Sequence, residues 1–131
     1  GSQKDGFMKY ERGRITNIYD FTNNIYVSYE SIANKMDSII GNVPAEHVTW
    51  KEIIKLKSRD SLLGAYFNNL NSTENLGSLL AKRYMKGTRE IGLKLVEQNV
   101  AKTEKDVNDV MLTGFFHSYG PINDFLPWEK I

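Results

Sequence analysis

The feature of the sequence that most constrains its fold is a run of apolar residues between Arg14 and Ile40. A first line of apolar residues recurs mostly at intervals of three or four: Ile15, Ile18, Ile25, Tyr29, Ile32, Met36 and Ile39. A second line lies beside it at intervals of seven: Tyr19, Tyr26, Ala33 and Ile40. Residues with this spacing share one side of an α-helix, and Gly41 favours an end to it. The pattern therefore predicts one long helix over residues 14–40, about 40 Å in length.

Three further segments carry helical patterns, over residues 50–69, 74–99 and 103–117, and a break of the first near Ser58 stays open as an alternative. Gly87 either ends the second of these helices or lies inside it. We favour a continuous helix, because the apolar residues after the glycine keep the helical phase. Thr103 and Asp106 stand at the spacing that can cap the third helix.

These patterns predict an all-α protein, a single compact domain of four to five helices built on the long N-terminal helix. A strand near Ile25-Tyr26-Val27 is a local alternative, because β-branched and aromatic residues favour strands. Residues 1–13 are expected to be a flexible lead that starts with a cloning scar at Gly1-Ser2, and residues 14–131 a helical domain with an aromatic C-terminal tail. We expect a signal peptide, a membrane anchor or another domain before Gln3.

Composition excludes several classes of function. The chain has no cysteine, which rules out disulfides, thiolate catalysis and cysteine-based zinc sites. Its net charge of +1 does not fit a strongly basic nucleic-acid-binding protein. The sequence holds no Gly-rich phosphate loop, calcium-binding loop or zinc-peptidase motif. We therefore expect neither a cofactor nor a metal ion.

Two features of the sequence could form a binding surface. The tail contains five aromatic residues: Phe115, Phe116, Tyr119, Phe125 and Trp128. Such a tail either closes the end of the domain or forms an exposed patch that docks a partner. Residues 51–94 hold nine Lys or Arg and four Asp or Glu, a net charge of +5, and Lys82, Lys86 and Arg89 fall near one side of the expected helix. A basic stripe attracts phosphates, anionic lipid headgroups or an acidic partner, or is a solvated helix face.

The leading hypothesis is a non-catalytic binding domain with a protein partner. The aromatic residues would anchor that partner and the basic residues would steer it; the partner-binding set is Phe116, Tyr119, Phe125, Trp128, Lys82, Lys86 and Arg89. The absence of cysteine and the expected preceding segment favour the extracytoplasmic part of an exported or membrane-anchored bacterial protein. Contact with a membrane would come only through the missing anchor.

Two other classes of function stay open. A cytosolic regulatory or nucleic-acid-associated protein would use the basic face at residues 82–94, although nucleic acid is the less favoured partner because the sequence has no clear helix-turn-helix. An enzyme would centre on His117 as a general base, a residue that could instead cap the end of a helix. A homodimer through residues 14–40 is compatible with each hypothesis, because the expected helix has enough apolar width to pack on two sides.

Overall fold

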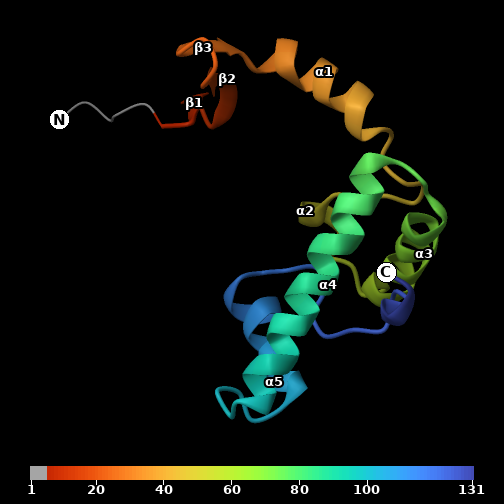
Figure 1. Cartoon of the computed structure of the whole chain (residues 1–131). Helices are drawn as coiled ribbons and strands as arrows, with labels where there is room; N and C mark the ends of the chain where they lie inside the picture. Colours follow the sequence, from red (N-terminus) through yellow and green to blue (C-terminus); the bar gives the residue numbers. More distant parts are fainter. Residues whose placement is uncertain (1–5) are drawn as a thin grey trace. The chain divides into compact units, whose positions relative to one another are not determined.

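The computed structural model describes residues 6–131 of the chain. Internal contacts divide the chain into two compact units, Gly1–Asn42 and Val43–Ile131, which we call the N-terminal unit and the C-terminal unit (Figure 1). From residue 6 onward, the N-terminal unit contains three strands and one helix, whereas the C-terminal unit is built from helices and a long C-terminal segment.

The sheet of the N-terminal unit is antiparallel, with strand order β1-β2-β3. A two-residue turn joins β1 (Met8–Glu11) to β2 (Arg14–Asp20). Both residues of this turn have positive φ angles, 50° at Arg12 and 78° at Gly13. Type I′ turns require such angles, and their twist matches that of a hairpin. The Arg12-Gly13 pair therefore sets the first reversal of the chain.

The second hairpin connects β2 to β3 (Ile25–Ser28) through a loop that begins at Asp20. The Asp20 carboxylate accepts hydrogen bonds from the backbone N–H groups of Thr22 and Asn23 and, at 2.8 Å, from the Asn23 side chain. The pKa of Asp20 is lowered by these hydrogen bonds, most of all by the one from the Asn23 side chain. Turns in which an Asp side chain accepts hydrogen bonds from the backbone that follows it reverse the chain. Helix α1 (Tyr29–Ile40) follows β3 directly, and none of its residues is fully buried.

The prediction of an all-α fold is wrong, because the chain is a mixed α/β protein. The long helix expected over residues 14–40 is replaced by β2, β3 and the shorter α1. Strands that carry apolar or aromatic residues on both faces also place such residues three or four positions apart. Here the consecutive residues Ile18 and Tyr19 of β2 lie on opposite faces of the sheet, and they pair with Val27 and Tyr26 of β3. The strand that we held as the alternative at Ile25-Tyr26-Val27 is confirmed.

The expected organisation of the chain changes with the fold. Met8–Glu11, which we expected in a flexible lead, pairs with β2 as strand β1, and Gly1-Ser2 lies outside the described residues. The chain divides after Asn42, instead of forming a single domain from residue 14. The homodimer expected through residues 14–40 was based on the apolar face of one long helix, and the structure does not contain that helix.

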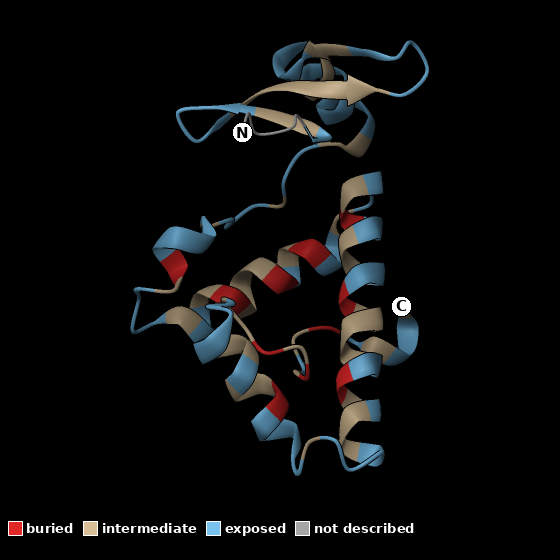
Figure 2. Cartoon of the chain, turned by 90° about the vertical axis from the view of Figure 1, so that its left-hand side faces the viewer, coloured by how far each residue is buried: buried red, intermediate tan, exposed pale blue. Residues whose placement is uncertain are grey.

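The C-terminal unit contains four α-helices, α2 (Trp50–Ile53), α3 (Arg59–Ser72), α4 (Leu76–Glu97) and α5 (Glu104–Asp109). A π-helical turn, η1 (Val110–Gly114), continues α5, and a short 3-10 helix, η2 (Trp128–Lys130), lies near the C-terminus. Figure 2 shows the buried residues of these helices on the sides that face the interior of the unit. The core cluster draws on α2, α3, α4 and the C-terminal segment: Ile53, Leu63, Phe67, Leu70, Met85 and Leu126.

Two of the predicted helices are confirmed in their main features. α4 is continuous through Gly87. Its first turn is capped by Asn75, whose side-chain oxygen accepts a hydrogen bond from the backbone N–H of Ser78 at 2.8 Å. α5 begins with the predicted capping box, in which Thr103 and Asp106 each accept a hydrogen bond from the backbone N–H of the other. The cap at Asn75 starts α4 two residues later than the expected residue 74, whereas Thr103 caps α5 as predicted.

The C-terminal segment, residues 115–131, returns through the unit and contributes to its core. Ile122 lies between α4 and α5, since a Cβ atom added at Gly92 would come within 2.9 Å of its side chain and 3.5 Å of Val107. The Asn108 side chain holds the backbone of Ile122 from both sides. Its amide nitrogen donates to the Ile122 carbonyl at 2.7 Å, and its amide oxygen accepts from the Ile122 N–H at 3.0 Å. The aromatic tail therefore closes the C-terminal unit from within.

Candidate functional site

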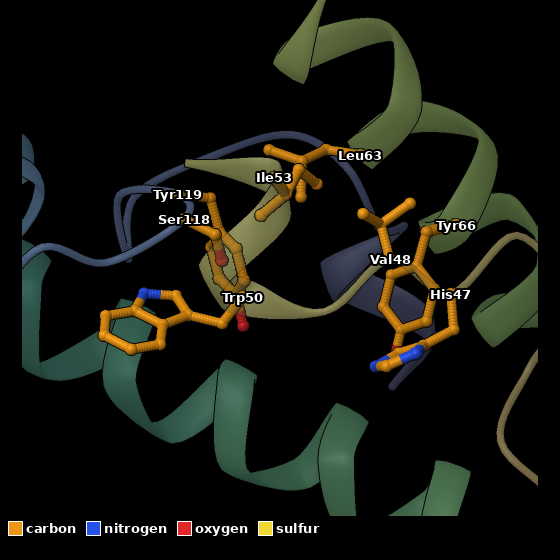
Figure 3. A pocket seen from close by; sticks show the side chains of 8 residues that line it. All are labelled: His47, Val48, Trp50, Ile53, Leu63, Tyr66, Ser118 and Tyr119. Atoms are coloured by element: carbon orange, nitrogen blue, oxygen red, sulfur yellow. The ribbon is translucent and has the colours of Figure 1, made fainter. Parts of the chain in front are cut away.

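A cavity of about 190 Å³ lies in the C-terminal unit between α2, α3 and the C-terminal segment. We call it the tyrosine cavity, because two tyrosines form much of its wall (Figure 3). The loop before α2 and α2 itself supply four lining residues, and α3 and the C-terminal segment supply two each. The lining residues are His47, Val48, Trp50, Ile53, Leu63, Tyr66, Ser118 and Tyr119.

Trp50 forms one edge of the tyrosine cavity and is 48% exposed. It is the first residue of α2, and its indole N–H donates to the carbonyl oxygen of Phe116 at 2.5 Å, across 66 positions of sequence. Phe116 has a φ angle of 54°, in the left-handed region that non-glycine residues rarely adopt. Strained backbone of this kind persists where its surroundings hold it. Here the turn at Phe116 presents the carbonyl that fixes the Trp50 ring.

The two tyrosines of the cavity are held by a single core residue, Phe67. Its ring contacts Tyr66 edge-on at 5.3 Å between centroids and Tyr119 at 5.1 Å. The buried side chains of Ile53 and Leu63 complete the apolar part of the wall. Burial raises the pKa values of both Tyr66 and Tyr119 above the usual 10.0. Both phenols therefore stay neutral at physiological pH and present hydroxyl groups that can donate or accept hydrogen bonds.

These raised pKa values predict a loss of stability in base. The unfolded chain ionises its tyrosines near pH 10, whereas the folded state keeps Tyr119 and Tyr66 neutral to higher pH. The free energy of unfolding should therefore be fully retained below pH 10 and fall as the pH rises above it. Urea unfolding across this range, for the wild type and Tyr119→Phe, measures the effect. The variant should lose less stability in base; an identical pH dependence of the two proteins would contradict the prediction.

The polar groups of the tyrosine cavity are separated from one another. Figure 3 shows His47 beside Tyr66 at one side, and Ser118 with Tyr119 and Trp50 at the other. The His47 and Tyr66 rings meet edge-on, with centroids 5.8 Å apart. A catalytic pair would need a nucleophile and a base within hydrogen-bonding reach, and His47 and Ser118 do not form such a pair here. Over residues 6–131, no group of three or more His, Asp or Glu side chains could hold a metal ion.

The predicted aromatic anchors fall into two groups. Tyr119 lines the tyrosine cavity, and Phe116 is exposed beside Trp50. Phe125 and Trp128 pack into the unit instead. The Phe125 ring stacks on Phe67 at 4.8 Å between centroids, and the indole N–H of Trp128 donates to the carbonyl of Asn123 at 2.5 Å. The structure thus brings Phe116 and Tyr119 to one site and gives Phe125 and Trp128 contacts within the chain.

The three basic residues that were expected to steer a partner all contact the chain itself. Lys82 donates to the carbonyl of Asn71 at 3.4 Å, and Lys86 donates to the carbonyl of Ile131. Arg89 donates to the Asn123 carbonyl at 3.4 Å and lies 3.9 Å from the Asp124 carboxylate. Its guanidinium also lies 5.7 Å from the centre of the Trp128 ring. Lys86 and Arg89 therefore hold the C-terminal segment against α4.

His117, the candidate catalytic base, is exposed and does not line the tyrosine cavity. Its backbone N–H donates to the carbonyl of Met111 at 3.0 Å and closes the turn after η1. Sequence reasoning missed the roles of His47, Trp50 and Tyr66. Trp50 and Tyr66 fit the apolar pattern of the expected second helix, and no local signal indicated that Tyr119 would meet them.

Comparison of the chain with known protein families, with curated proteins and with solved structures finds no match. Within residues 6–131, no helix is both long enough and apolar enough to span a membrane.

Proposed function

We propose that the C-terminal unit is a non-catalytic protein-interaction module that receives one apolar side chain of a partner protein in the tyrosine cavity. The observation that carries this proposal is the cavity itself. Its volume of about 190 Å³ lies below the range of roughly 300–1,000 Å³ typical of small-molecule and cofactor sites, and is comparable to a single large apolar side chain. Binding energy at protein interfaces concentrates where one side chain fills such a desolvated pocket.

The chemistry of the cavity wall supports the same proposal. Trp50, Tyr66 and Tyr119 give large apolar contact surfaces, and the two tyrosines end in hydroxyl groups that can form hydrogen bonds. An anchor side chain would contact the rings and Ile53, while the hydroxyls at the edge would pair with the backbone of the partner segment. Residues of this kind are enriched at interfaces because they lose little conformational entropy on binding.

The position of the basic side chains favours this function over a nucleic-acid-associated one. Lys82, Lys86 and Arg89 would have to leave their contacts with the chain before they could meet phosphates. A location outside the cytoplasm stays part of the proposal and rests on the absence of cysteine.

A selection from a library of random peptides, displayed against the full chain, tests the proposal. Enriched peptides should share an apolar anchor residue such as Leu, Phe or Trp. Their affinity should fall about thirtyfold on Trp50→Ala, because removal of an aromatic residue that contacts the anchor costs about 2 kcal/mol of binding free energy. Isothermal titration calorimetry with one synthetic peptide measures the change.

Two further variants decide whether the cavity itself is used. Ser118→Phe places a ring in the cavity and should abolish binding of the same peptide. Phe115→Ala removes an aromatic side chain that is 64% exposed and lines no part of the cavity, so it should leave the affinity unchanged. Peptides without a common apolar anchor, or a peptide that binds Trp50→Ala and Ser118→Phe as tightly as the wild type, would refute the proposal.

A further inference from the structure

A hollow of about 510 Å³ lies in the C-terminal unit where the end of α4 meets α5 and η1, and we call it the aliphatic groove. Figure 1 shows α5 beside the last turns of α4. Two charged residues, Lys102 and Asp106, line the groove. Its other lining side chains are apolar, and none of them is aromatic: Leu95, Val100, Ala101, Val107, Val110 and Met111. The groove shares no lining residue with the tyrosine cavity.

The backbone on two sides of the aliphatic groove has uncommon conformations. Just after α4, Asn99 has a φ angle of 57°, in the left-handed region that ends many helices. This turn brings the backbone N–H groups of Val100 and Ala101 to the carbonyl of Leu95, at 2.9 and 3.0 Å. On the other side, the π-helical turn η1 supplies Val110 to the wall. Turns of this kind are rare and are frequent at functional sites.

The size and the lining of the aliphatic groove suit a small molecule with an aliphatic chain. Its volume lies within the range of roughly 300–1,000 Å³ typical of small-molecule sites. Val100 and Val110 are 71% and 56% exposed, so a bound chain would remove apolar surface from water. A flat aromatic ligand would gain additional stabilisation from aromatic rings in the wall, and this wall contains none.

The two charged residues at the rim restrict the head group of such a ligand. Lys102 and Asp106 are both exposed. The backbone N–H and the hydroxyl of Thr103 both donate to Oδ2 of Asp106, at 2.9 and 2.8 Å, and hold this carboxylate in place. An anionic head group would be repelled by Asp106, and a cationic one by Lys102. An uncharged hydroxyl can accept a hydrogen bond from an ammonium group and donate one to a carboxylate.

We propose that the aliphatic groove binds a small lipid-like molecule, an aliphatic chain that ends in an uncharged hydroxyl head group. The chain would lie against the apolar wall between α4 and η1, and the hydroxyl would lie at the rim with Lys102 and Asp106. This site is separate from the tyrosine cavity, so the chain would bind such a molecule and a partner protein at different places.

NMR titration of the full, isotope-labelled chain with 1-octanol tests this inference. The amide signals of Leu95, Val107 and Val110 should shift and saturate. Octanoate and octyltrimethylammonium carry a chain of the same length with a charged head group. Each should bind at least about threefold more weakly, because it places a like charge near Asp106 or Lys102. Binding of either charged molecule as tightly as 1-octanol would contradict the proposed head group.

Two variants decide whether the groove itself is the site. Val110→Asp places a carboxylate in the apolar wall and should weaken 1-octanol binding by at least about tenfold. Leu79→Asp is the matched control; Leu79 is 58% exposed and does not line the groove, so the affinity should be unchanged. Circular dichroism confirms that each variant is folded.

Three outcomes would overturn the inference. Shifts that do not saturate, or that spread over the whole C-terminal unit, would indicate non-specific partition of 1-octanol. A Val110→Asp variant that binds as tightly as the wild type would place the ligand elsewhere. The full chain includes residues 1–42, so an N-terminal unit that occupies the groove would leave the signals unshifted. Peptide binding at the tyrosine cavity should survive in Val110→Asp, so failure here is distinguishable from failure of the proposed function.

Discussion

Replacing Phe67 with alanine is expected to lower the free energy of unfolding of the C-terminal unit by about 3–5 kcal/mol. Phe67 is 1% exposed. Its ring stacks on Phe125 and meets Tyr66 and Tyr119 edge-on. Truncation removes the transfer free energy of the ring and leaves a cavity that three aromatic neighbours cannot fill without moving. A domain of this size is stable by only about 5–15 kcal/mol, so the variant should be near the limit of folding.

Urea unfolding followed by tryptophan fluorescence measures this loss, and Phe115→Ala is its matched control. Phe115 is 64% exposed, and substitutions at such positions change stability by only about 0.5 kcal/mol. A Phe67→Ala variant that loses no more stability than Phe115→Ala would contradict the packing described for the core. Because Phe67 holds both cavity tyrosines, a folded Phe67→Ala variant should also bind anchor peptides less tightly.

Replacing Gly120 with alanine is expected to cost about 2–4 kcal/mol of stability. A Cβ atom at this position would lie 2.3 Å from Cγ and Oδ1 of Asn108 and 2.6 Å from its Cβ. Asn108 would have to move, and its two hydrogen bonds to the backbone of Ile122 would be lost. Because the Ile122 backbone is part of the packed C-terminal segment, unpaired groups there are costly.

Replacing Gly64 with alanine is the same chemical change, but it is expected to raise the free energy of unfolding. Gly64 lies inside α3, and a Cβ atom added there would meet no atom within 4 Å. Alanine stabilises a helix interior relative to glycine by about 0.5–1 kcal/mol, so this variant should gain stability. Thermal and urea unfolding of the two variants should give changes of opposite sign. Equal changes in both would show that Asn108 and Gly120 are not in contact.

Local sequence signals determined the course of α4 and the start of α5. The phase of the apolar residues predicts a helix that continues through Gly87, and α4 does so. The Thr103–Asp106 spacing predicts a capping box, and α5 begins with one. Such features depend on residues three or four positions apart, whose interactions are made within one helical turn. They can therefore be read without knowing the rest of the fold.

Pairing between distant segments decided the remaining structure. In the N-terminal unit, the same spacing of apolar residues fits a helix and a hairpin, and the pairing of β2 with β3 and the turn held by Asp20 select the hairpin. The tyrosine cavity depends on contacts such as that of Trp50 with Phe116, 66 positions apart, and Lys86 faces inward because it meets Ile131, 45 positions away. Composition alone determined that this chain has no disulfide or thiolate chemistry. The proposed binding surfaces could be found only from the tertiary structure. Contacts between distant segments decide which aromatic and basic side chains stay exposed.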